Sequence, residues 1–439
     1  MSEHAQATRR EFFGWSAAAA GAGTVAAAPA VSSTIPNAND TIRLGLIGCG
    51  PQGKNDLFQC LKAPKTAVVA LCDVDPARLR GTLEKTGGKV DTYADFRRVL
   101  DRKDIDAVIV ATPDHWHAIP ALQALRSGKD VYLEKPVGHT VREGQLLVET
   151  ARRHQRIVQV GLQQRSGGVF QEAARLVRSG KIGQVSEAHC FNAWNMTPGG
   201  TGRALPIGNP PDSDPPEGVD YEMWLGPAPK RLFNPNRFHW NYIYFWDYSG
   251  GMTIAWGVHL VDIVLWVMQV KGPRAVAVSG GKYVLRDARE TPDTLEAVFD
   301  FPGFTLTYSC RHANRFPMGS RRLDHGMQFL GTQATLLVDR TGYQIIPEGE
   351  KPEPVSSPAE LTGGNGPHQQ DFLDCARSRK TPACDILEGH RSTVAMQLAN
   401  IAFRTDRKIH WDPDNEKIAG DPGAAALLSK QYRPPWSLV

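Results

Sequence analysis

A glycine-rich turn, Gly48-Cys49-Gly50-Pro51-Gln52-Gly53, most constrains what this chain can fold into. It follows an apolar run at 42–47 and opens a segment with helical periodicity, which is the strand–turn–helix setting that a GxGxxG motif needs. The glycines permit a tight turn and close approach of the backbone, and the helix N-terminus offers unpaired N–H donors to an anion. The motif therefore predicts a doubly wound domain that holds a dinucleotide by its pyrophosphate. A glycine turn without a ligand is the alternative.

An acidic residue strengthens this prediction. Asp73 lies twenty residues after Gly53, at the expected end of the second strand. A carboxylate there accepts hydrogen bonds from ribose hydroxyls and repels a 2′-phosphate. We therefore expect the cofactor to be NAD, in preference to NADP.

The rest of the chain predicts an α/β protein in two parts. Up to about residue 161, short β-branched runs alternate with amphipathic stretches, which indicates a Rossmann-type, doubly wound parallel sheet with strands at 42–47, 67–71, 107–110, 131–133 and 157–161. Longer strands separated by loops follow and predict an α+β domain with a large, mainly antiparallel, open sheet. The expected boundaries are 1–39 for a leader and linker, 40–161 for the dinucleotide-binding domain, 162–385 for the substrate and oligomerisation domain, and 386–439 for a C-terminal helix and tail that pack back on the first domain.

The leader has an export pattern. Thr8-Arg9-Arg10-Glu11-Phe12-Phe13 precedes an alanine-rich apolar run at 15–28, and small residues at 26–30 offer cleavage sites. This resembles a twin-arginine signal, a route that carries folded proteins with their cofactors. We expect a periplasmic or extracytoplasmic protein with no stable membrane span after signal removal. A disordered or membrane-tethered tail is the alternative.

Composition excludes several classes of partner and site. The 50 basic and 46 acidic residues are spread along the chain, which gives no support to nucleic-acid binding. Seven scattered cysteines without a CxxC pair indicate buried thiols, not a disulfide framework or a zinc cluster. His115 and His117 form a His-x-His pair, but no third ligand has suitable spacing, so no metal site is expected.

Two further motifs leave predicted strands at their carboxyl ends, where open α/β sheets bind ligands. They are Ala111-Thr112-Pro113-Asp114-His115-Trp116-His117 and Glu134-Lys135-Pro136. Together with the glycine turn and a later Gly257-Val258-His259, they resemble the Gfo/Idh/MocA family, which includes glucose–fructose oxidoreductase and inositol dehydrogenase. The resemblance runs from about residue 41 to Trp411-Asp412-Pro413. It implies an NAD(P)-dependent oxidoreductase.

The resemblance also implies the site. Lys135 would lie beside the nicotinamide and the reacting hydroxyl, next to a cis Lys135–Pro136 bond, and His259 would hydrogen-bond that hydroxyl. The chemistry agrees, because a lysine beside cationic NAD⁺ has its ammonium form disfavoured and histidine suits acid–base work near neutral pH. The expected cofactor-binding residues are Gly48, Gly50, Pro51, Gln52, Gly53, Asp73, Thr112, Pro113, His117, Glu134, Lys135 and Gln163.

One departure from the family pattern bears on the proton route. Many members carry an Asp four residues before the catalytic histidine, where this chain has Ala255. Either Lys135 and His259 suffice, or Asp262 orients the imidazole, or the reaction is not a simple dehydrogenation. The aromatic residues crowded into 221–256 could stack on sugars or pack in the core. The expected substrate contacts are Arg165, Trp240, Tyr244 and Asp262.

Three functions stay open. The first is hydride transfer to or from a carbon of a sugar, polyol or glycoside, with a tightly held cofactor because an exported enzyme has no pool of free nucleotide. The second is redox-neutral glycoside hydrolysis or elimination through a 3-keto intermediate. The third is non-catalytic sugar binding. A small-molecule sugar or glycoside is the expected partner, and the outer face of the second sheet predicts a homodimer or homotetramer.

Overall fold

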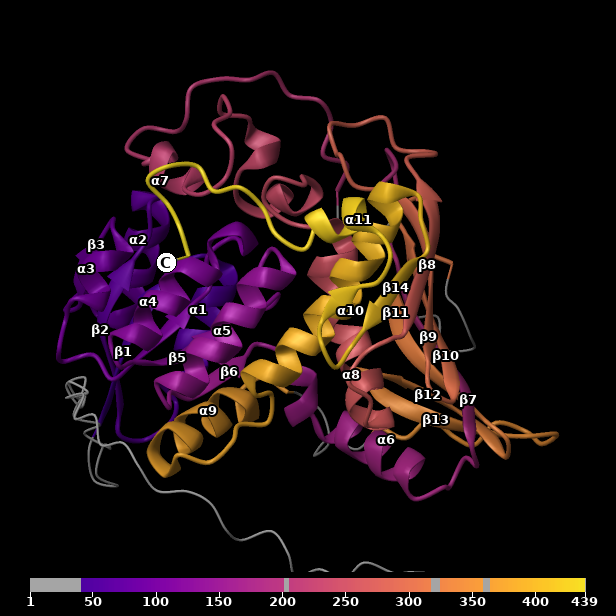
Figure 1. The fold of residues 1–439 in the computed structure, drawn as a ribbon. Coiled ribbons are helices and arrows are strands. Elements are labelled where there is room, and N and C mark those ends of the chain that lie inside the picture. Colours follow the sequence, from indigo (N-terminus) through magenta and orange to yellow (C-terminus); the bar gives the residue numbers. More distant parts are fainter. Residues whose placement is uncertain (1–40, 201–204, 317–323, 358–363, 439) are drawn as a thin grey trace, which may run out of the picture. The chain divides into compact units, whose positions relative to one another are not determined.

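The computed structural model describes residues 41–200, 205–316, 324–357 and 364–438, so the predicted export signal lies outside the described residues. The first part of the described chain forms a six-stranded parallel sheet in the order β3-β2-β1-β4-β5-β6, which confirms the predicted Rossmann architecture (Figure 1). Its strands are β1 (Ile42–Ile47), β2 (Thr66–Cys72), β3 (Asp91–Tyr93), β4 (Ala107–Val110), β5 (Asp130–Leu133) and β6 (Val158–Val160). Its helices are α1 (Pro51–Cys60), α2 (Pro76–Leu83), α3 (Phe96–Leu100), α4 (Ala118–Arg126) and α5 (Val141–Arg153).

The strand order reverses between β1 and β4, which creates the crevice where open α/β sheets bind ligands. Helix starts are well defined around it. Proline occupies the first position of α1, Asp75 caps α2 through its side chain, and Thr140 and Glu143 form a capping box on α5. These caps place the N-termini of α1 and α2 at the crevice.

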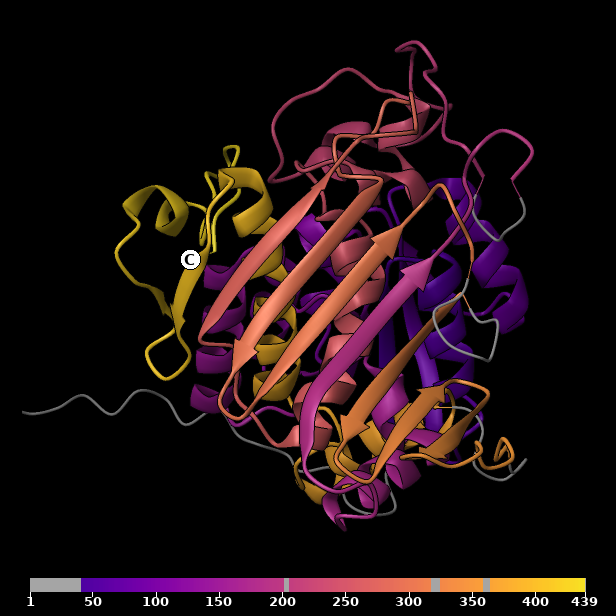
Figure 2. The same cartoon turned by 90° about the vertical axis from the view of Figure 1, so that its right-hand side faces the viewer.

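The second part forms a nine-stranded sheet in the order β13-β12-β11-β7-β10-β9-β8-β14-β15, and Figure 2 shows its open face toward the viewer. The strands are β7 (Val185–Ala193), β8 (Ala275–Gly281), β9 (Thr294–Phe301), β10 (Phe304–Arg311), β11 (His325–Gly331), β12 (Ala334–Asp339), β13 (Gly342–Pro347), β14 (Ile409–Asp412) and β15 (Lys417–Ile418). All neighbouring pairs are antiparallel except β7 and β10, which run parallel. The large, mainly antiparallel sheet is therefore confirmed.

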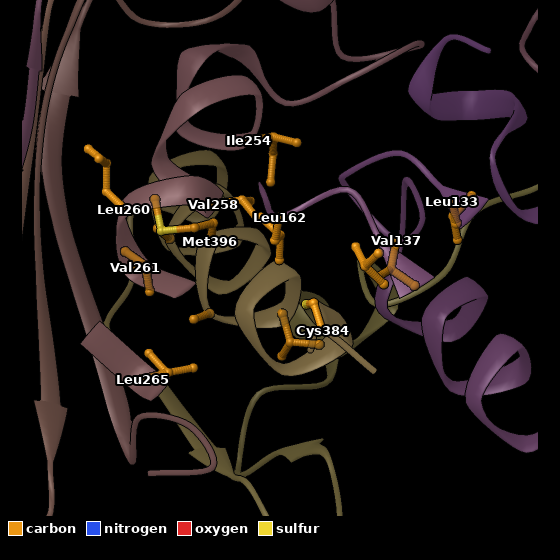
Figure 3. Packing of buried hydrophobic residues seen from close by; sticks show 14 of the residues in the cluster. Leu133, Val137, Leu162, Ile254, Val258, Leu260, Val261, Leu265, Cys384 and Met396 are labelled. Atoms are coloured by element: carbon orange, nitrogen blue, oxygen red, sulfur yellow. The ribbon is translucent and has the colours of Figure 1, made fainter. Parts of the chain in front are cut away.

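The second part of the described chain also contains helices. They are α6 (Gly168–Arg178), α7 (Tyr221–Leu225), α8 (Val258–Met268), α9 (Pro367–Ser378), α10 (Ile386–Thr405) and α11 (Pro422–Ala426). Helix α8 is apolar on nearly every face, and α10 carries polar residues but is buried over most of its length, so both are enclosed in the core. Figure 3 shows Val258 and Val261 of α8 packed beside Met396 of α10, within the core that continues into the first sheet at Leu133.

The C-terminal tail returns to the first sheet's helices. The ammonium group of Lys430 pairs with Glu143 of α5 at 2.9 Å, and the hydroxyl of Tyr432 donates to the same carboxylate at 2.6 Å. The Trp436 ring meets the Trp116 ring edge-on, with 4.7 Å between centroids. The tail therefore ties α5 to the loop after β4.

Several features differ from the sequence prediction or go beyond it. The third strand β3 and the short β14–β15 pair were not predicted, because each offers only two to four residues of pattern. A turn of π-helix at Thr253–Gly257 precedes α8. All seven cysteines are buried free thiols. Among the described helices, none combines the length and apolar character needed to cross a membrane.

Candidate active site

A cavity of about 550 Å³ lies at the carboxyl edge of the first sheet. One wall comes from the loops after β1, β2, β4 and β5, and the other comes from 223–243, the start of α8 and the β12–β13 turn. Among the predicted site residues, the cavity is lined by Gly48, Gly50, Pro51, Gln52, Asp73, Thr112, Pro113, His117, Glu134, Lys135, Gln163, Trp240 and His259.

The geometry of the turn requires glycine at two of its positions. Gly48 has φ +98°, and a Cβ there would lie 2.5 Å from the carbonyl oxygen of Ala111. Gly53 does not line the cavity; a Cβ at that position would lie 2.0 Å from the carbonyl oxygen of Gly48, so this glycine lets α1 pack against the turn. Arg78 reaches over the turn, 3.0 Å from an ideal Cβ on Gly50, and is a cavity residue that sequence reasoning missed.

Two acids of the loop after β2 occupy one end of the cavity. Asp73 accepts the backbone N–H of Cys49 at 2.7 Å and that of Asp75 at 2.9 Å, which fixes its carboxylate beside the glycine turn. Burial raises the pKa of Asp73, and these backbone donors work against that rise. Asp75 uses one oxygen to cap α2 and the other to meet His239 Nε2 at 3.1 Å.

The loop after β4 is held by main-chain carbonyls. His117 places Nδ1 at 2.6 Å from the carbonyl of Pro136 and Nε2 at 2.8 Å from that of Thr112, so it joins the loops after β4 and β5. Both of its ring nitrogens are thereby occupied within the protein. The Thr112 hydroxyl, in contrast, is buried without a protein partner. Such an orphaned hydroxyl beside a glycine turn fits a bound polar ligand.

The two predicted catalytic residues lie on this cavity. Lys135 follows β5, has the predicted cis bond to Pro136, and donates from Nζ to the carbonyl oxygen of Ala255 at 3.2 Å. That carbonyl belongs to the π-helical turn, four residues before His259. Burial, followed by the nearby Arg340 and Lys135 charges, holds the pKa of His259 well below its usual range. Its Nδ1 is buried without a hydrogen-bond partner.

A pair of buried carboxyl groups lies beneath Lys135. Gln52 Nε2 donates to Asp56 at 3.0 Å and to Glu134 at 3.2 Å, while Gln163 donates to Glu134 at 3.0 Å. Burial raises the pKa of both acids, and more so that of Asp56, because its neighbour Glu134 also faces Lys135. Both shifts favour the protonated carboxyl form, more strongly at Asp56. Sequence reasoning missed Asp56, although its place one turn after Gln52 put both on one face of α1.

Three of the predicted substrate contacts, Arg165, Tyr244 and Asp262, lie outside the cavity lining. Arg165 and Asp262 form a buried ion pair, with Nη2 to Oδ1 at 2.8 Å, and neither lines the cavity. Asp262 also accepts from Ser392, and His259 Nδ1 has no hydrogen-bond partner, so the two side chains are not joined through that nitrogen. Tyr244 is fully buried, with its hydroxyl 3.5 Å from the Met196 sulfur. Trp240 does line the cavity, and 63% of its surface is exposed.

The His-x-His pair takes part in packing contacts. His115 Nε2 lies 3.0 Å from the carbonyl of Trp224, and burial lowers its pKa to about 3. Within the described ranges, no group of three or more His, Cys, Asp or Glu side chains is arranged to hold a metal ion.

Comparison with known proteins identifies a family for this chain. The sequence profile of the Gfo/Idh/MocA oxidoreductase family, NAD-binding Rossmann fold, matches residues 42–162. The profile of the same family's C-terminal alpha/beta domain matches 181–290 and 352–438. The cavity lies between these two matched regions, so both contribute to its walls.

Individual curated relatives match this chain over only part of their length. Inositol 2-dehydrogenase of Burkholderia cenocepacia is 32% identical over 152 residues, which are 34% of this chain and 45% of that protein. A glycosyl hydrolase family 109 protein of Shewanella pealeana is 32% identical over 139 residues, 30% of each chain. The alignments thus span less than half the length of these relatives.

Among solved structures, the WlbA dehydrogenase of Bordetella pertussis, in complex with NADH and UDP-GlcNAcA, superposes with a TM-score of 0.65 at 19% identity. The superposition covers 86% of this chain and 99% of that one, which establishes a common fold. Together with the two profile matches, the glycine turn and the Glu-Lys-Pro and Gly-Val-His motifs, this shows that the chain belongs to the Gfo/Idh/MocA family of NAD-binding oxidoreductases.

Proposed function

We propose that this protein transfers hydride between NAD and a carbon of a sugar, polyol or glycoside. One observation carries the proposal: Lys135 and His259, from different halves of the chain, line the same cavity as the glycine turn, and Lys135 donates to the carbonyl of Ala255, four residues before His259. A nicotinamide ring bound in this cavity supplies the hydride acceptor or donor. The protein must then bind the substrate hydroxyl and move its proton.

His259 is the proposed base for that proton. Its low pKa keeps the imidazole neutral at physiological pH, so it can accept a proton without first losing one. With Nδ1 buried, we assign the acceptor to Nε2. Lys135 is the proposed donor to the substrate oxygen. The carbonyl of Ala255 accepts one N–H of its ammonium group, which leaves two N–H groups for the substrate.

These roles of Lys135 and His259 account for a site with Ala255 in place of the family's Asp. A carboxylate there would raise the pKa of His259, whereas a backbone carbonyl orients Lys135 without adding charge. We therefore propose that Lys135 and His259 suffice for proton transfer. The expected pH profile of kcat/KM has its acid limb below pH 6.5, because the low pKa of His259 keeps it neutral there. An acid limb above pH 7 would remove His259 from this role.

Redox-neutral glycoside cleavage is the second candidate, favoured by the similarity to the glycosyl hydrolase family 109 protein. That route needs an additional base for a carbon acid. Tyr242 on the cavity wall does not supply one, because burial and Asp114 raise its pKa well above 10. In this candidate His259 would have to serve the carbon acid as well.

Export through the twin-arginine route, with the cofactor already bound, is part of the proposal. It is supported by the Arg9-Arg10 signal pattern and by the second wall of the cavity, which covers the nucleotide-binding edge. The protein purified from the extracytoplasmic fraction should release NAD or NADH on denaturation. A preparation that is folded but free of nucleotide would contradict the captive cofactor.

The substrate experiment separates the candidates. The nucleotide-loaded protein is mixed with a panel of aldoses, polyols and aryl glycosides, while NADH absorbance and free aglycone are followed. Formation of NADH with an oxidised sugar supports dehydrogenation, and NAD-dependent aglycone release without net NADH supports cleavage. Binding of sugars with neither signal would support the non-catalytic alternative and overturn the proposal.

A further inference from the structure

The second wall of the cavity is built differently from the first. It comes largely from residues 219–242, here called the clamp segment, which leave the second domain and lie across the loops after β2 and β4. Its cavity-lining side chains are Met223, Trp224, Phe238, His239, Trp240 and Tyr242. Of these, His239 contacts Asp75 and lies near Arg78 at one end of the cavity.

The clamp segment is attached to the first domain at both ends. At its start, Asp220 N donates to the carbonyl of Val74 at 3.1 Å. In the middle, Trp116 Nε1 donates to the carbonyl of Trp224 at 2.9 Å. At its end, Tyr242 donates from its hydroxyl to Asp114 at 2.9 Å. These contacts bind the segment to two loops that carry predicted cofactor residues.

A glycine permits the closest approach of the two parts. Gly226 has φ +48°, and a Cβ at that position would lie 2.0 Å from the Trp116 ring. The C-terminal tail covers the same place, where Arg433 Nε donates to the carbonyl of Gly226 at 2.9 Å. The middle of the clamp segment is therefore enclosed between the tail and the first domain.

His239 makes a side-chain contact close to the predicted ribose site. Its Nε2 lies 3.1 Å from Asp75 Oδ2, and Asp75 is two residues beyond Asp73. The backbone of His239 has φ +53°, a conformation that non-glycine residues adopt when their surroundings impose it. Burial and the Arg78 charge lower the pKa of His239 to about 4, so the neutral imidazole donates one hydrogen bond to the Asp75 carboxylate.

We infer that the clamp segment binds the adenosine half of the dinucleotide and that the His239–Asp75 contact is the latch that limits nucleotide release. The exposed Trp240 ring and the His239 ring line the cavity and offer faces for a purine, and the nearby acids offer acceptors for ribose hydroxyls. In this inference the His239–Asp75 contact does not touch the nicotinamide half. The inference rests on nucleotide binding by the first domain and is independent of the proposed reaction.

The test measures nucleotide release from the full-length protein loaded with NADH. Excess NAD⁺ is added, and the loss of NADH fluorescence gives the dissociation rate. His239→Asn removes the imidazole while tolerating the left-handed backbone, and should raise the dissociation rate roughly tenfold, as expected for the loss of one hydrogen bond to a charged group. Leu232→Ala changes an exposed side chain of the same segment and is the matched control, with an unchanged rate.

Fragments of the cofactor locate the effect. His239→Asn should weaken binding of ADP-ribose by about the same factor and leave nicotinamide mononucleotide binding unchanged. Gly226→Ala, which forces the segment away from Trp116, should act in the same direction, with thermal melting used to verify that the variant is folded. An unchanged release rate in His239→Asn, or equal effects on both fragments, would overturn the clamp. Failure of every sugar to react would instead overturn the proposed reaction and leave the clamp standing.

Discussion

The two ends of the cavity are built on opposite principles. At the adenosine end, the acids after β2 are hydrogen-bonded to backbone amides and covered by the clamp segment. At the reactive end, Lys135 has a single carbonyl partner, and His259 keeps a buried nitrogen without any. Satisfied polar groups hold a ligand rigidly, whereas the Lys135 ammonium, with one carbonyl partner, keeps N–H groups for a substrate. The comparison teaches that binding and chemistry are separated along one cavity.

Removing Lys135 should produce the largest effect and test that separation. Lys135→Ala is expected to lower kcat about a thousandfold, within the range for loss of a proton-transferring group, because the substrate oxygen loses its proposed donor. Retention of NADH should be unchanged, as measured by fluorescence. Lys89→Ala, at an exposed lysine, is the control. A large loss of nucleotide binding in Lys135→Ala would break the comparison.

The converse change lies at the adenosine end. Asp73→Asn removes the charge while keeping the size of the side chain, so NAD affinity should fall about tenfold through the weaker hydrogen bonds to ribose. The preference for NAD over NADP should shrink, and kcat at saturating NAD should be retained. Titration calorimetry and steady-state kinetics measure the two quantities. Asp101→Asn, on the exposed surface, serves as control; a fall in kcat alone would contradict the assignment of Asp73.

The carboxyl pair under the reactive end gives the smallest effect, and one that depends on pH. Because the folded-state pKa of Asp56 is raised, its contribution to stability is present below the unfolded pKa near 3.8 and is lost as pH rises through the folded pKa. Asp56→Asn keeps an acceptor for Gln52 and supplies a donor toward Glu134. It should raise the free energy of unfolding at pH 8.

Denaturant unfolding at several pH values checks this sign. The gain in Asp56→Asn should disappear near pH 4, where the wild-type carboxyl already carries its proton. A variant that is less stable than the wild type at pH 8 would show that the ionised carboxylate is needed there.

The features that could be predicted from the sequence are those that depend on a local residue pattern. Strand alternation, the glycine turn and Asp73 sufficed for the first sheet, because each depends on neighbours within one βαβ unit. The parallel pairing of β7 with β10 left no such trace, since pairing partners far apart in sequence carry no local signal. The three residues of β3 were too few to show a period.

In the site, too, residues in local motifs were predicted and contacts between distant segments were not. The Glu-Lys-Pro motif after a strand and the Gly-Val-His match to the family named Lys135 and His259, and the structure brings both to one cavity. Arg165 and Asp262 were assigned to substrate because a charged residue in an isolated motif has no visible partner, and only folding pairs them. The contact between His239 and Asp75 escaped for the same reason, as it joins two loops that the sequence does not relate.

The seven buried thiols have a practical consequence for watching the molecule work. None is paired, and all lie within the described residues, so a thiol-reactive dye would find no accessible target on the folded protein. A cysteine introduced in place of the exposed Leu232 would then carry the label alone. Fluorescence from that single position could follow, in real time, whether the polypeptide lifts each time a nucleotide departs.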